Sequence, residues 1–197
     1  QQKNRDLLTL RRDIVKSFEE CEIANFLYLN QIEYTYEKPY HIDLSTNEKR
    51  NYKPDFTLIN DFGERVYLEH FALDANGNAP AWFREGYKEL AEKKIEMLNL
   101  DGAKCIFTYS HQKKSEKLIP HLEKSLKQYN FTLKPFSSDK IIEILNQTNE
   151  INKFSELLKT FLNHFKSEGS NFNILRKKAL KTINPLRSNA FIDFFEI

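Results

Sequence analysis

The chain has 197 residues, of which 40% are hydrophobic and 29% are charged, and its formal net charge is +2. This length and composition indicate a globular protein of one domain or slightly more, and they exclude a disordered chain. No apolar run reaches the roughly 18 residues that span a bilayer, so we expect no membrane partner and a cytoplasmic location. The two cysteines, Cys21 and Cys105, lie in apolar stretches and are expected to be reduced.

The first half of the sequence predicts one main helix followed by three strands. A short helix is expected over 5–16, as a lead-in to the domain. Ser17 and Glu20 have the S-x-x-E form of a capping box, which opens a helix that runs to about Asn30. Alternating residues rich in Tyr, Phe and Ile predict strands over 32–40, 52–59 and 65–71.

The second half alternates once more between helix and strand and then becomes wholly helical. Apolar spacing predicts a helix over 82–98, a buried strand over 103–109, a basic helix over 113–129 and a short strand over 131–134. The later segments have helical periodicity over 138–147, 150–167, 171–183 and 188–197. This order predicts an α/β fold, in which a mixed central sheet is flanked by helices and followed by an all-helical C-terminal part.

Both ends of the sequence suggest a piece of a larger protein. The sequence does not begin with Met, and it stops inside a dense apolar stretch that includes Phe191, Phe194 and Phe195. A helical end of this kind lacks capping residues and should continue into further structure. The expected parts are a lead-in at 1–16, a domain at 17–135 and a helical segment at 136–197.

Two charged residues share a helix face with apolar side chains. Glu20 precedes apolar residues of its helix by three, four and seven positions, and Lys94 falls on the apolar face of the 82–98 helix. Lysines are almost never fully buried unless they are paired. Lys94 therefore needs an anionic partner, and we regard both residues as candidates for a functional site.

Two further acids fall on neighbouring strands. If the turn at residues 60–63 closes a hairpin, Asp55 and Glu69 become cross-strand neighbours. Adjacent carboxylates repel each other unless a cation or a proton lies between them, and oxygen ligands favour Mg²⁺ or Mn²⁺. A cation bound by these acids could activate a water for attack on a phosphodiester, with Lys94 stabilising the negative charge and Glu20 in support.

Structural explanations exist for each of these four residues. Glu20 has the capping-box position, and Asp55 has the sequence environment of a turn. Glu69 could form an ordinary ion pair with Lys53 or Lys94, and the lysine could keep only its methylene groups buried. From the spacing alone, both the functional and the structural interpretation stay open.

Several segments together resemble a PD-(D/E)xK nuclease-like domain. More narrowly, they resemble the form of this domain that is inserted into helicase IV-like DNA helicases, which belong to the UvrD/Rep group of superfamily 1. The matching segments are VKSFEECEIANFLYLNQIEYTYEKPY (15–40), YKPDFTL (52–58), VYLEHFALD (66–74), WFREGYKELAEKK (82–94) and IFTYS (106–110). Their order and spacing agree over about residues 9–130. Two later segments, FLNHFKSEGSN (161–171) and IDFFEI (192–197), resemble helical segments of the helicase body.

The resemblance implies a restriction-endonuclease-like αβββαβ core, with Asp55 and Glu69 as metal-binding acids, Glu20 as a helix-borne acid and Lys94 as the catalytic lysine. Phe71 occupies the lysine position of the simple E-x-K pattern, and a lysine on the next helix is a known variation of it. The implied cofactor is Mg²⁺ or Mn²⁺. Because the sequence has no G-x-x-x-x-G-K-[ST] motif, ATP is expected only in the parent helicase.

The resemblance also implies DNA, single-stranded or forked, and the remainder of the helicase polypeptide as partners. Lys113, Lys114 and Lys117 could follow phosphates, and Trp82 could stack on a base. A lysine-rich helix is more often a solvated face, and the tryptophan could equally belong to the core. The expected function is a DNA-handling, nuclease-like domain. The alternatives are a catalytically inactive accessory module beside the helicase motor and a module for protein interaction alone.

Overall fold

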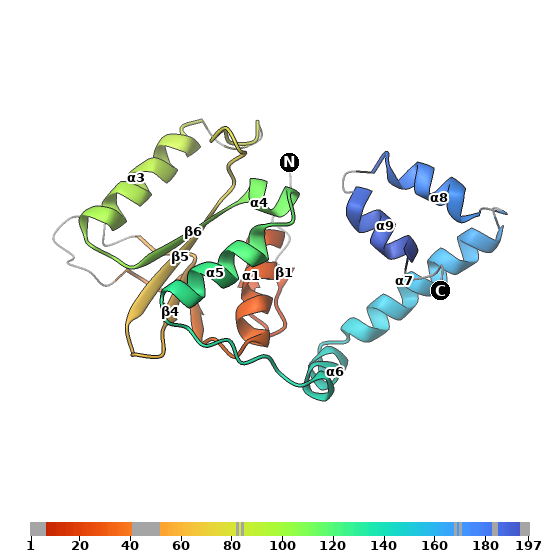
Figure 1. Ribbon diagram of the computed structural model, residues 1–197, viewed down its shortest axis with the longest axis horizontal. Coiled ribbons are helices and arrows are strands. Elements are labelled where there is room, and N and C mark those ends of the chain that lie inside the picture. The colour runs from red at the N-terminus through yellow and green to blue at the C-terminus, as the bar shows by residue number, and fades with distance from the viewer. Residues whose placement is uncertain are drawn as a thin grey trace. The chain divides into compact units, whose positions relative to one another are not determined.

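The computed structural model describes residues 7–40 and 52–193, except for residues 82, 84, 168, 170, 183 and 184. The chain forms two compact units, of which the first ends at Ile141 and the second begins at Ile142. Figure 1 labels the helices and strands of both units. Within the described part of the chain, no helix is long and apolar enough to cross a membrane.

The centre of the first unit is a mixed sheet of four strands. They lie in the order β3-β4-β5-β6, with the first two pairs antiparallel and the last pair parallel. The strands are β3 (Tyr34–Tyr36), β4 (Phe56–Ile59), β5 (Arg65–Phe71) and β6 (Cys105–Tyr109). A helix joins the parallel pair, as a crossover connection requires. The predicted mixed sheet flanked by helices is therefore confirmed.

Helices cover both faces of this sheet, as Figure 1 shows. α1 (Phe18–Leu29) and α5 (Leu118–Gln128) pack on one face, around a core that includes Phe56. α3 (Tyr87–Leu100) packs on the other face, over Tyr67. Because β5 is covered on both sides, six of its seven residues are buried. A polar side chain on β5 therefore needs a partner within the protein.

The predicted lead-in helix is wrong, because this segment forms a hairpin. β1 (Leu7–Leu8) pairs antiparallel with β2 (Ile14–Val15). Between them, Arg12 has a φ of 71°, and the Thr9 N–H donates to the Asp13 carbonyl at 2.9 Å. The Asp13 N–H also donates to the Thr9 hydroxyl at 3.0 Å. Such side-chain bonds offer the backbone an alternative to the helix.

The hairpin is attached to the sheet through Tyr34. The Arg11 guanidinium lies 3.6 Å from the centre of the Tyr34 ring and donates to the Tyr34 carbonyl at 2.7 Å. The Tyr34 hydroxyl donates to Asp13 Oδ2 at 2.7 Å. These contacts join the hairpin to β3, the edge strand of the sheet.

We predict that Tyr34→Phe lowers the free energy of unfolding by about 1 kcal/mol, because the ring stays and one hydrogen bond is lost. Urea titration followed by circular dichroism measures this change. Tyr28→Phe is the control, since the Tyr28 hydroxyl has no hydrogen bond with the described residues. Equal stability of the wild type and Tyr34→Phe would show that the hairpin is not held in this way.

The predicted basic helix over 113–129 is two helices. α4 (Ser110–Lys114) ends before Glu116, which has a left-handed φ of 57°, and α5 then begins. Pro120 explains the break. Inside a continuous helix a proline would lack a hydrogen bond and clash with the preceding turn, whereas the first turn of a new helix tolerates it.

Three other predicted boundaries differ from the structure. The second strand of the sheet begins only at Phe56, because Pro54 has no N–H for the ladder. The helix after the Gly- and Asn-rich loop begins only at Tyr87, behind Gly86 in a left-handed conformation (φ 81°). The segment predicted as a strand over 131–134 forms no strand.

The described elements of the second unit are all helices. They are α7 (Glu150–Ser167), α8 (Phe172–Ala179) and α9 (Pro185–Asp193), and α6 (Ser138–Gln147) contains the division between the units. Aromatic rings pack together inside the second unit, Phe161 against Phe165 and Phe191, and Phe165 against Phe172. The helical periodicity of the sequence accounts for these elements.

Candidate functional site

The pairing of β4 with β5 brings two acidic residues together. Phe56 lies opposite Leu68, and continuing this register by one residue places Asp55 opposite Glu69. The backbone N–H of His70 donates to Asp55 Oδ2 at 2.8 Å and holds the carboxyl group there. The hairpin thus makes the two acids neighbours, as their spacing around the turn predicts.

Glu69 is buried, and both oxygens of its carboxylate have partners. Its side chain is 1% exposed. The Tyr52 hydroxyl donates to Oε1 at 2.6 Å, and the Lys94 ammonium donates to Oε2 at 2.9 Å. The same ammonium lies 5.3 Å from the centre of the Tyr52 ring. Glu69, Tyr52 and Lys94 therefore form one bonded group between β5 and α3.

The charged form of Asp55 is disfavoured at its position. Burial, together with the charges of Glu69 and Glu20, raises the pKa of Asp55 well above its ordinary value, against smaller opposite effects of His70 and Lys94. Among the described residues, none donates a hydrogen bond to its second oxygen, Oδ1. A cation next to Asp55 would relieve this repulsion.

Lys94 is the cation that the site already contains. Burial lowers the pKa of Lys94, but the charge and hydrogen bond of Glu69 and the charge of Asp55 outweigh it, and the net pKa is raised. The Lys94 side chain is 38% exposed, so it still reaches solvent. It can therefore present a positive charge to an anion that approaches from outside.

Glu20 is tied into the start of α1. Its carboxylate accepts hydrogen bonds from the Lys16 N–H at 3.1 Å, the Ser17 hydroxyl at 3.0 Å and the Tyr36 hydroxyl at 2.5 Å. Ser17 in turn caps the helix by accepting from the Glu20 N–H at 3.0 Å. Glu20 thus has a capping role, and it also lies close enough to contribute to the raised pKa of Asp55.

His70 points to the sheet face opposite Glu69 and is buried. Its Nδ1 lies 2.9 Å from the hydroxyl of Thr108, which donates to the Glu69 carbonyl at 3.3 Å. The direction of the His70–Thr108 bond depends on the tautomer of the ring, and the other ring nitrogen, Nε2, lies 3.5 Å from the Ser110 hydroxyl. Burial lowers the pKa of His70 to about 4, against a smaller opposite effect of Glu20.

Asp55 and Glu69 are the residues that could hold a metal ion. Within the described residues, no three His, Cys, Asp or Glu side chains are grouped so as to hold one. Mg²⁺, however, usually keeps several waters and binds one or two carboxylates together with substrate phosphates. The unbonded Oδ1 of Asp55 fits this requirement. Glu69 fits it through Oε2, whose partner in this structure is the mobile, partly exposed side chain of Lys94.

The structure places the three predicted DNA-binding lysines at the end of α4 and at the start of α5. Lys113 forms an ion pair with Glu22 of α1, which explains why it is only partly exposed. Lys114 and Lys117 are exposed, one at the end of α4 and the other just before α5. Trp82 lies outside the described residues.

Sequence reasoning missed Tyr52 and Tyr36, the two hydroxyls that bond the carboxylates of Glu69 and Glu20. Tyr36 lies two residues after Tyr34 in the predicted strand, so strand alternation predicts that both side chains lie on the same face of the strand. Tyr52 precedes Pro54, where the strand pattern breaks down, and its direction does not follow from the sequence. The one available signal for a bonding role of Tyr52 is that it lies three residues before an acid, Asp55.

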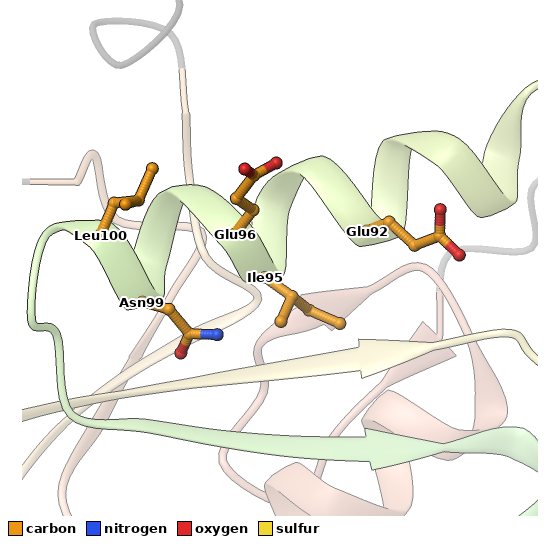
Figure 2. Close-up of a pocket in the computed structure, with 5 residues that line it drawn as sticks. All are labelled: Glu92, Ile95, Glu96, Asn99 and Leu100. Carbon is orange, nitrogen blue, oxygen red and sulfur yellow. The ribbon is translucent and has the colours of Figure 1, made fainter.

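A shallow pocket lies apart from this site, along α3. It has a volume of about 440 Å³, and the residues that line it all come from that helix, as Figure 2 shows: Glu92, Ile95, Glu96, Asn99 and Leu100. None of the candidate site residues takes part in it. The candidate site is therefore defined by its side-chain contacts.

Comparisons with known proteins do not assign the chain to a family. No family model matches it, and neither a curated protein nor a solved structure matches it. Functional inference therefore rests on the geometry of Asp55, Glu69 and Lys94 and on the residues that surround them.

Proposed function

We propose that the first unit is a nuclease-like domain that acts on the phosphodiester backbone of DNA, within a larger DNA helicase. The proposal rests on one observation above all: Asp55, Glu69 and Lys94 come from three separate segments and meet at one place on the sheet. This supports the restriction-endonuclease-like arrangement expected from the sequence motifs. The helicase context rests on those motifs alone.

The roles of the residues follow from their contacts. A bound Mg²⁺ or Mn²⁺ would supply an activated water for attack on phosphorus. Asp55 would bind the cation through Oδ1 while the His70 N–H fixes Oδ2, and Glu69 would bind it through Oε2. Lys94 would then neutralise the negative charge that develops on the phosphate. Glu20 shapes the electrostatics of the site from its place in the helix cap.

A second candidate function is a catalytically inactive module that binds DNA or a partner protein beside the helicase motor. The observation that favours it is the bonding of two of the three acids: Glu69 pairs with Tyr52 and Lys94, and Glu20 caps α1. In that case the polar group stabilises the fold and needs no metal. DNA binding that weakens with salt, without any cleavage, would support this function.

The test is cleavage of single-stranded, duplex and forked DNA with Mg²⁺ or Mn²⁺. We expect the wild-type chain to cut at least one of these, and Glu69→Gln to cut at least about a hundredfold more slowly, because a charge that binds the metal is lost. Glu96→Gln is the matched control, since Glu96 is exposed on α3, and it should keep wild-type activity. A wild type that cuts none of the three DNAs would leave the accessory module as the better proposal.

A further inference from the structure

Glu69 offers its two oxygens to two very different partners. Oε1 accepts from Tyr52, which is 8% exposed and packs against Tyr40 with ring centres 5.3 Å apart. Tyr40 in turn packs against Tyr67 at 4.8 Å. These edge-to-face and tilted ring contacts hold the Tyr52 hydroxyl in place, and the hydroxyl in turn fixes the direction of the Glu69 carboxylate.

Oε2, by contrast, accepts from a partner that can leave. Lys94 approaches from α3 on a long side chain that is 38% exposed. Its ammonium can move into solvent by rotation about side-chain bonds, without disturbing α3. Glu69 itself cannot follow, because its side chain is 1% exposed and is bonded to Tyr52.

We propose that Tyr52 is a positioning residue that leaves Glu69 one oxygen for one cation, and that Lys94 and a divalent metal ion are alternative occupants of that place. This inference rests on the proposed metal-dependent function. When the metal binds Oε2, Lys94 is released from Glu69 and its charge becomes available to a phosphate. The lysine thus acts against metal binding and in favour of cleavage, two effects of opposite sign that a purely catalytic or purely structural lysine would not show.

Calorimetric titration of Mn²⁺ into the whole chain tests the competition. Lys94→Met should bind Mn²⁺ at least about tenfold more tightly than the wild type, because a neighbouring positive charge that opposes the metal is removed. Lys93→Met is the matched control, since it removes the same charge from the adjacent, exposed position of α3 and should bind like the wild type. Lys94→Arg, which keeps the charge, should also bind no more tightly than the wild type.

Tyr52→Phe tests the positioning role, since it keeps the ring and its contact with Tyr40 and removes only the hydroxyl. Placed in the Lys94→Met chain, it should weaken Mn²⁺ binding again, by about fivefold or more, because Glu69 loses the bond that directs Oε2. Thermal unfolding with and without Mn²⁺ provides a second readout. The metal should raise the melting temperature of Lys94→Met more than that of the wild type.

The outcomes separate this inference from the function on which it rests. If the wild type binds Mn²⁺ and Lys94→Met binds it equally or less tightly, the competition is overturned while the metal site stands. If neither protein binds Mn²⁺ and the metal shifts neither melting temperature, both the competition and the metal site are overturned. Tighter binding by Lys94→Met alone supports the competition even if no DNA is cut.

Discussion

Asp55→Asn should make the protein more stable, by about 1 kcal/mol, while it removes the proposed DNA cleavage. The physical reason is the raised pKa of Asp55, which burial and the charges of Glu69 and Glu20 cause. Asparagine has nearly the same shape and still accepts from the His70 N–H, but it carries no charge. An acid whose charge costs stability is a sign of function, since a purely structural position would favour the neutral residue.

Urea titration at neutral pH measures the stability, and the cleavage assay measures the activity. Asp61→Asn is the matched control: Asp61 is exposed and likewise accepts one backbone N–H, from Thr132 at 3.0 Å. We expect no gain in stability from the control. A loss of stability in Asp55→Asn would instead show that the charged carboxylate supports the fold through Lys94, and it would favour the accessory module.

The candidate site was largely predictable from periodicity. Lys94 on an apolar helix face and Glu69 on a central strand are both charged residues in places where only a partner makes them tolerable. The length of the turn between β4 and β5 sets the register of the hairpin, and this register places Asp55 opposite Glu69. These arguments work because they use spacings within single elements or across one short turn.

The remaining features depend on contacts between distant segments. Tyr52 bonds Glu69 across 17 positions of sequence, from a stretch that belongs to no regular element. Lys113 forms an ion pair with Glu22 of α1, a helix that lies far from Lys113 in the sequence. Local patterns carry no signal for such pairs, so the sequence predicted neither the Tyr52–Glu69 bond nor the Lys113–Glu22 ion pair.

The prediction of a lead-in helix over 5–16 was wrong for a different physical reason, since this segment forms the β1–β2 hairpin. Residues 5–16 have several good helix formers, and propensity alone favours a helix there. Turn bonds between Thr9 and Asp13, together with the attachment of Arg11 to Tyr34, outweigh that preference. Propensity is a weak influence of a few tenths of a kcal/mol per residue, so a few specific bonds are enough to reverse it.

Acidification should destabilise the wild-type protein through His70. The pKa of His70 is lowered to about 4 by burial, from an ordinary value of 6.5. The unfolded chain therefore binds the proton more tightly than the folded chain does. The contribution of His70 to the free energy of unfolding is complete above the ordinary pKa of 6.5, and it is lost as the pH falls toward the folded-state pKa of about 4. Over this window the loss amounts to at most about 3 kcal/mol.

Asp55 acts in the opposite direction over part of the same range. Because its pKa is raised, the folded chain binds that proton more tightly, and the stability contributed by Asp55 grows as the pH falls. The pH dependence of the wild type alone is therefore a difference between two effects. A variant that removes only the imidazole is needed to isolate the contribution of His70.

His70→Asn is that variant, because its amide has both a donor and an acceptor and can still bond the Thr108 hydroxyl in place of Nδ1. Urea titrations between about pH 7 and about pH 4 should show that the wild type loses up to about 3 kcal/mol more than His70→Asn does. The double variant with Asp55→Asn also lacks the stability that Asp55 contributes on acidification, so it should lose more stability toward pH 4 than His70→Asn does. Parallel curves for the wild type and His70→Asn would mean that the imidazole takes up its proton inside the fold, with Glu20 as the acid near enough to compensate it.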